Sequence, residues 1–219
     1  MSAAPMTPVT PLASLGAGFS NEAFGSQAVF RAVLQALSHP GRSVAVEHDA
    51  QTPAVGHAAS AAVLLALLDS DCTLWLSPRL AAGAAGAWLR FHTGCTLVSE
   101  AAQARFVWVA QGDVVPPLDS LALGSDIYPD QSATCVVDVL RATAAPTDSQ
   151  GAWHLRGPGI QQVAALQVES LPDDFEARWA ANHAVFPRGV DLLLATAGHI
   201  VGLPRTTRAV RVAAALQEA

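Results

Sequence analysis

Apolar segments of two alternating periodicities constrain the fold of this chain more than any other feature. Apolar residues recur at helical spacing between Phe24 and Leu37, and His39-Pro40-Gly41 ends that pattern. The same analysis predicts two further helices and three short apolar strands, at about 58–68 and 79–91 and at 44–46, 73–76 and 106–109. The first half of the chain therefore predicts strands that alternate with helices.

Strands dominate the second half. They are predicted at 133–140, 152–156, 163–168, 190–195 and 199–203, with one helix at 173–184 and a short arginine-dotted segment at 205–212. Ala197-Gly198 joins the last two strands as a hairpin. Together the two halves predict an α/β fold in which helices flank a mixed central sheet.

The domain organisation follows from the same pattern. Residues 1–22 contain three prolines among small residues and are predicted to be a flexible lead-in, followed by a single α/β domain at 23–212 and a tail at 213–219. The segment 112–130 is long enough to be functional or to mark a boundary between two lobes.

Composition excludes several classes of protein. Hydrophobic residues make up 51% of the chain and charged residues 14%, which excludes intrinsic disorder. The longest apolar run, 58–68, is shorter than the roughly 18 residues of a membrane-spanning helix. No basic residue precedes Arg31, so we expect no signal peptide and a cytoplasmic location. The net charge of -6 argues against nucleic acid or membrane as a partner.

All 12 basic residues are arginines. Without lysine the chain cannot form the Schiff base that pyridoxal phosphate (PLP) requires, and it has no P-loop lysine. The spacings of its three cysteines, Cys72, Cys95 and Cys135, and of its histidines match no metal motif. We therefore expect neither PLP nor a metal.

Arginine and hydroxyl side chains meet near the end of the chain. Arg205, Thr206 and Thr207 follow the predicted strand 199–203, and ligands of open α/β sheets bind beyond strand ends. This group suits a phosphate or a carboxylate. A solvated edge that contacts another subunit is the alternative.

Three other segments could contribute to an anion site, and each has a structural alternative. Arg188 lies in a turn into a strand. Gly157 and Gly159 could form an anion nest or a tight turn. Arg90, His92 and Thr93 could be ligands or the capped end of a helix.

Five strings in order resemble one family, and together they span 24–207. They are Phe30-Arg31 with Ala36-Leu37-Ser38-His39-Pro40-Gly41, Arg90-Phe91-His92-Thr93, Gly157-Pro158-Gly159-Ile160, Phe186-Pro187-Arg188-Gly189-Val190-Asp191-Leu192-Leu193-Leu194, and Pro204-Arg205-Thr206-Thr207. The chain resembles the PhnH family, the H subunits of the bacterial carbon–phosphorus lyase system for phosphonate breakdown.

The resemblance implies a fold similar to the large domain of PLP-dependent transferases, with the cofactor chemistry lost. It also implies a homodimer that associates with the G, I and J subunits. Their complex would form ribose 1-phosphonate 5-triphosphate from ATP and an alkylphosphonate. The family supplies no catalytic residue that can be assigned to this chain.

Two hypotheses stay open. In the first, the chain is a non-catalytic assembly subunit of the ribose 1-methylphosphonate 5-triphosphate synthase. In the second, it binds a phosphonate or a nucleotide triphosphate through arginines and hydroxyls of the candidate set, namely Arg90, His92, Arg188, Arg205, Thr206 and Thr207. A third reading is an unrelated small-molecule transferase whose motifs match by chance.

Overall fold

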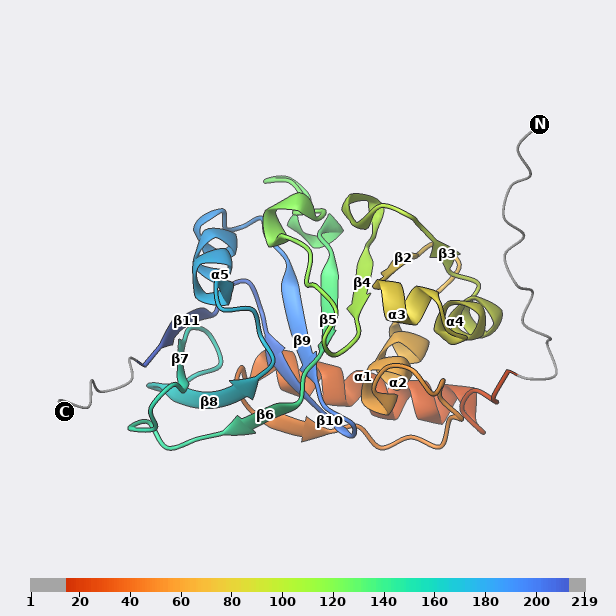
Figure 1. Ribbon diagram of the computed structural model, residues 1–219, viewed down its shortest axis with the longest axis horizontal. Coiled ribbons are helices and arrows are strands. Elements are labelled where there is room, and N and C mark those ends of the chain that lie inside the picture. Colours follow the sequence, from red (N-terminus) through yellow and green to blue (C-terminus); the bar gives the residue numbers. More distant parts are fainter. Residues whose placement is uncertain (1–14, 213–219) are drawn as a thin grey trace.

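The computed structural model describes residues 15–212, and the predicted tail at 213–219 lies outside them. A seven-stranded mixed sheet forms the centre, and a four-stranded antiparallel sheet packs beside it (Figure 1). The predicted α/β class with a mixed central sheet is thus confirmed. A second, separate sheet was not expected.

The central sheet has the order β1-β10-β9-β5-β4-β2-β3. In that order the strands are Ser43–Ala45, His199–Leu203, Asp191–Ala195, Thr134–Asp138, Phe106–Val109, Thr73–Leu76 and Thr96–Leu97. Strands β3, β2, β4, β5 and β9 pair in parallel, whereas β10 is antiparallel to both β9 and β1. The predicted hairpin between β9 and β10 is confirmed.

Alternating side chains of the middle strands bury both faces of this sheet. On β5, Val136 packs into one hydrophobic cluster, while Cys135 and Val137 pack into the other. On β9, Leu193 and Leu194 likewise belong to opposite clusters. Because both faces are covered, these strands are continuous apolar runs.

Helices cover one face of the central sheet. They are α1 (Glu22–Ser38), α2 (Ala58–Leu67) and α4 (Ala85–Thr93). Helix α1 starts where the Asn21 side chain accepts a hydrogen bond from the Phe24 backbone, and it buries Val29 and Val33. Helix α2 is buried along most of its length, which agrees with its apolar sequence.

The other face is covered by the second sheet and by α5 (Phe175–Ala184). The order of the second sheet is β11-β7-β8-β6, with strands Arg208–Arg211, Trp153–Arg156, Ala164–Glu169 and Arg141–Ala144. Trp153 of β7 packs edge-on against Phe175, which stacks on Trp179 of α5. These aromatic contacts join the second sheet to α5.

Three predicted elements differ from the structure. The single helix expected at 79–91 is two helices, α3 (Pro78–Ala81) and α4, separated at Gly83. The strand expected at 133–140 ends at Asp138, after which the chain enters β6. The arginine-dotted segment near the end contains β11, which pairs with β7.

Two segments predicted as irregular have defined local structure. Within the lead-in, 1–14 lie outside the described residues, but the Gly16 carbonyl accepts a hydrogen bond from Trp88 Nε1 at 2.8 Å. The loop 112–130 carries the 3-10 turn η3 (Leu118–Ser120) and leads into η4 (Pro129–Gln131); η2 (Ala101–Gln103) lies earlier in the chain.

Within 15–212, no helix is both long and apolar enough to cross a membrane.

Candidate functional site

Arg205 is the most heavily bonded of the predicted anion-site residues. Its side chain is 12% exposed, and its Nη2 lies 2.6 Å from Oδ2 of Asp191. Its backbone N–H and its Nε also donate to Oδ1 of Asp191. Nη1 donates to the Pro129 carbonyl at 2.8 Å, and Nη2 donates to the Ser132 hydroxyl. The guanidinium is thus bound by acceptors of its own chain.

Arg188 lies close to this group but has a different partner. Asp191 binds Arg205, and Arg188 Nε instead lies 3.2 Å from Oδ1 of Asp126. Although the two atoms are close, the Nε hydrogen is not aligned for a hydrogen bond. Arg188 and Arg205 therefore meet at the loop that precedes β5, each beside a carboxylate.

Thr206 and Thr207 lie beside Arg205 in the chain, and Gly157 packs against them. A Cβ atom at Gly157 would lie 2.9 Å from the carbonyl oxygen of Thr206. The Thr207 hydroxyl is fully buried and has no hydrogen-bond partner within the described residues. Gly159 packs instead against the end of α1, at the Ser38 carbonyl. Both glycines have positive φ angles and allow close backbone approach.

Arg90, His92 and Thr93 lie on α4, at the opposite end of the molecule from α5 (Figure 1). His183 of α5 bonds the Arg205 carbonyl, so Arg205 lies at the α5 end. The alternative that these α4 residues form the capped end of a helix agrees with Gly94, which caps α4 with a left-handed φ of 74°. His92 Nε2 bonds the Gly16 carbonyl at 3.0 Å, and the Thr93 hydroxyl donates to Leu89. The candidate residues therefore do not form one site.

The direction of β10 changes the interpretation of the Arg205 region. Ligands of open α/β sheets bind at the carboxyl ends of the parallel strands. Because β10 is antiparallel to β9, the end of β10 lies instead at their amino edge. The premise that placed Arg205 at a ligand-binding edge is therefore wrong, since strand direction cannot be read from an apolar pattern.

The carboxyl edge of β2, β4 and β5 carries a different cleft, which the sequence analysis missed. Its volume is about 700 Å³, and it is lined by Arg79 after β2, Gln111 after β4, Asp138 at the end of β5, and residues before α2 that include His57. Arg79 donates to the Gln111 carbonyl at 3.1 Å and pairs with Asp113. The sequence signal was a charged or polar residue at the end of, or just beyond, each of three apolar strands.

Asp138 is the buried carboxylate of this cleft, with 2% of the residue exposed. It accepts hydrogen bonds from the Ser60 hydroxyl at 2.5 Å, the His57 backbone at 2.9 Å and Trp108 Nε1 at 3.1 Å. Since His57 and Ser60 lie at the start of α2, the carboxylate caps that helix and fixes it to β5. Burial raises the pKa of Asp138, and the three hydrogen bonds oppose that rise.

None of the three cysteines is activated as a catalytic nucleophile. Burial raises the pKa of Cys72 and Cys95, and it raises the pKa of Cys135 to about 12. Reactive cysteines have a lowered pKa instead. Within residues 15–212, no three His, Cys, Asp or Glu side chains lie close enough to hold a metal ion.

Comparison with known proteins identifies the family. A family model described as bacterial phosphonate metabolism protein (PhnH) matches residues 17–210. The subunit PhnH of alpha-D-ribose 1-methylphosphonate 5-triphosphate synthase from Rhizobium meliloti (strain 1021) is 39% identical over 192 residues, which cover 87% of this chain and 92% of that protein.

A second relative, from Stutzerimonas stutzeri, is described as a candidate C-P lyase subunit protein, HtxG. It is 35% identical over 187 residues, which cover 83% of this chain and 84% of the relative. Both relatives and the family model thus match across the α/β domain and not a single motif. The chain therefore belongs to the PhnH family of bacterial phosphonate metabolism proteins.

Proposed function

We propose that this protein is a non-catalytic subunit of an alpha-D-ribose 1-methylphosphonate 5-triphosphate synthase in phosphonate breakdown, and that it acts by association with the other subunits. The names of its relatives support the subunit role. One observation carries the non-catalytic part: Arg188 and Arg205, the central residues of the expected anion site, lie against Asp126 and Asp191 of the same chain.

The partners in this proposal are the G, I and J subunits of the carbon–phosphorus lyase complex, together with a second copy of the chain. The protein works without PLP, because it contains no lysine to form the Schiff base. The likeness to the large domain of PLP-dependent transferases belongs to the proposal as well. The mixed seven-stranded sheet covered by helices on one face supports it.

Growth on methylphosphonate tests the pathway role. A bacterium that breaks down phosphonates and lacks its own H-subunit gene would receive this chain on a plasmid, with methylphosphonate as the sole phosphorus source. We expect growth to be restored, and growth on inorganic phosphate to be equal with and without the plasmid. Failure of a well-expressed chain to restore growth, in a strain that its own gene does rescue, would contradict the proposal.

A second candidate function is the binding of a phosphonate or a nucleotide phosphate. The cleft at the carboxyl edge favours it, because Arg79 lies there at 65% side-chain exposure beside Gln111 and His57. Calorimetric titration with ATP and with methylphosphonate distinguishes the two functions. Heat that is lost in Arg79→Gln but kept in Arg90→Gln would support binding in the cleft, whereas the absence of heat would support assembly alone.

A further inference from the structure

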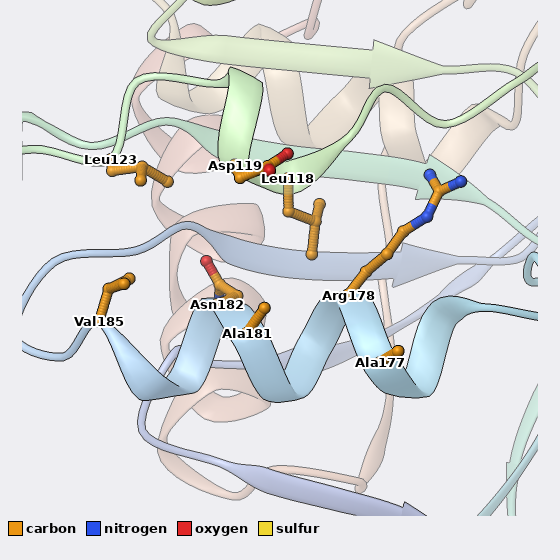
Figure 2. A pocket seen from close by; sticks show the side chains of 8 residues that line it. All are labelled: Leu118, Asp119, Leu123, Ala177, Arg178, Ala181, Asn182 and Val185. Carbon is orange, nitrogen blue, oxygen red and sulfur yellow. The ribbon is translucent and has the colours of Figure 1, made fainter.

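A second cleft lies between α5 and the loop that precedes β5. It has a volume of about 380 Å³ and is lined by Leu118, Asp119, Leu123, Ala177, Arg178, Ala181, Asn182 and Val185. Figure 2 shows Leu118 of the loop extending toward α5, above the short side chains of Ala177 and Ala181. Small residues on the helix and larger apolar residues on the loop leave an apolar depression, because alanine side chains cannot fill the space.

Exposed apolar side chains follow the cleft residues Leu123 and Val185 in the chain. Beyond Leu123 the chain reaches Ile127 and Tyr128, which are 79% and 55% exposed, and beyond Val185 it reaches Phe186, which is 58% exposed. We call this set the α5 surface: the cleft residues Leu118, Leu123 and Val185 with Ile127, Tyr128 and Phe186. Large apolar side chains next to an apolar cleft are typical of protein–protein interaction sites.

Hydrogen bonds hold the two segments of the α5 surface together. The Gly189 backbone donates to the Leu123 carbonyl at 2.9 Å. Arg205 Nη1 donates to the carbonyl of Pro129 at 2.8 Å and to that of Pro187 at 3.4 Å. Because Pro129 follows Tyr128 and Pro187 follows Phe186, Arg205 positions both groups of exposed side chains. A surface that is ordered before binding loses less entropy when a partner binds.

The charge around this surface is acidic. Asp119 lines the cleft, and Asp126 lies beside Ile127 with its side chain 76% exposed. The two arginines nearby, Arg178 and Arg188, pair with Asp174 and Asp126. Among residues 15–212 no arginine pairs with Asp119, so its carboxylate keeps an uncompensated negative charge beside the cleft. A chain with a basic residue next to an apolar segment complements this charge.

We propose that the α5 surface is the docking site for another subunit of the synthase, which inserts an apolar side chain into the cleft and places arginine or lysine near Asp119. This inference rests on the proposed function. Apolar contact at the cleft provides the affinity, and the Asp119 carboxylate accelerates association and selects a basic partner. Arg205 acts indirectly, by holding the two segments of the surface.

Co-expression with the G, I and J subunits tests this docking site. The double variant Ile127→Ala/Phe186→Ala removes exposed side chains and should leave the thermal unfolding temperature unchanged. We expect its dissociation constant for the other subunits to rise at least about tenfold. The matched control is Leu140→Ala, because Leu140 is also apolar and 60% exposed but lies beyond the carboxyl end of β5. It should bind within about twofold of wild type.

The charge component has a separate readout. Asp119→Asn should slow association and make the dissociation constant less sensitive to salt. If wild type binds the other subunits and the double variant binds equally well, the docking site is wrong and the proposed function stands. If wild type does not bind them, both proposals fail. If the double variant loses only self-association in sedimentation, the occupant is a second copy and the inference is overturned.

Discussion

The Arg205 guanidinium and the Asp191 carboxylate form a pair that ties the start of β9 to the end of β10. Nη2 of Arg205 lies 2.6 Å from Oδ2 of Asp191, and Nε lies 3.2 Å from Oδ1. The remaining donors of Arg205 bond carbonyls of Pro129 and Pro187 and the Ser132 hydroxyl. The residue that the sequence indicated as an anion ligand therefore holds three segments of the protein together.

Replacement of Arg205 should reduce the stability of the folded protein, because this residue has a structural role. Arg205→Ala leaves Asp191, which is partly buried, without its cation, and we expect the free energy of unfolding to fall by about 3 kcal/mol. The exposed Arg90→Ala serves as the control and should change it by less than about 0.5 kcal/mol. Urea denaturation measures both values. A loss below about 1 kcal/mol for Arg205→Ala would show that the pair contributes little.

Gly202 of β10 should not tolerate a side chain. A Cβ atom there would lie 2.5 Å from the carbonyl oxygen of Ala36, because β10 passes close to the backbone of α1. We expect Gly202→Ala to cost about 2 kcal/mol in chemical denaturation. Gly198→Ala is the matched control in the same hairpin, since a Cβ there meets no atom within 4 Å. Equal stability of the two variants would contradict this packing.

Asn182 lines the cleft between α5 and the loop that precedes β5, but we expect its role to be structural. Its side chain donates to the Val190 carbonyl at 3.0 Å and accepts from the Val190 backbone N–H at 2.8 Å. Asn182→Ala leaves both buried groups without partners, so we expect a loss of about 3 kcal/mol in unfolding free energy. The variant Asn21→Ala, which removes the N-terminal cap of α1, should lose only about 1 kcal/mol of unfolding free energy. A smaller loss at Asn182 than at Asn21 would argue against this role.

Asp138 should make stability depend on pH. Burial raises its pKa above the usual value of 3.8, so the folded protein binds this proton more tightly than the unfolded chain does. The stabilisation that results from this proton is therefore fully present below pH 3.8. It is lost as the pH rises through the pKa of Asp138 in the folded protein. Asp138→Asn cannot ionise.

Denaturation of both proteins between pH 4 and pH 7.5 measures this effect. The stability of Asp138→Asn relative to wild type should increase with pH over that range. The variant has a fixed cost at every pH, because its NH2 group replaces one carboxylate oxygen and cannot accept a hydrogen bond, as Oδ2 of Asp138 does from the His57 backbone. A difference that stays constant with pH would contradict the raised pKa.

The helices and the central strands were largely predictable from the sequence, because the spacing of apolar residues reflects whether one or both faces of an element are buried. Strand β10 was predicted at its observed bounds, His199–Leu203. The second sheet was not predicted, since β6 and β11 each bury only one side chain, Ala142 and Ala209. Such short, exposed strands acquire their pairing from partners distant in sequence.

The candidate site was less predictable than the fold, because it depends on strand direction. The sequence places Arg205 after a strand, but only the antiparallel pairing of β10 with β9 shows which edge of the sheet that is. The carboxyl-edge cleft joins Arg79 and Asp138, which are far apart in the chain. No local motif links them, so a pattern search could not bring them together.

Native mass spectrometry of this protein co-expressed with the G, I and J subunits tests the central claim most directly. We predict an assembly that contains this chain together with the other subunits, and its depletion when Ile127→Ala/Phe186→Ala replaces the wild type. A wild-type chain that is found only by itself, while the other subunits assemble without it, would contradict the account.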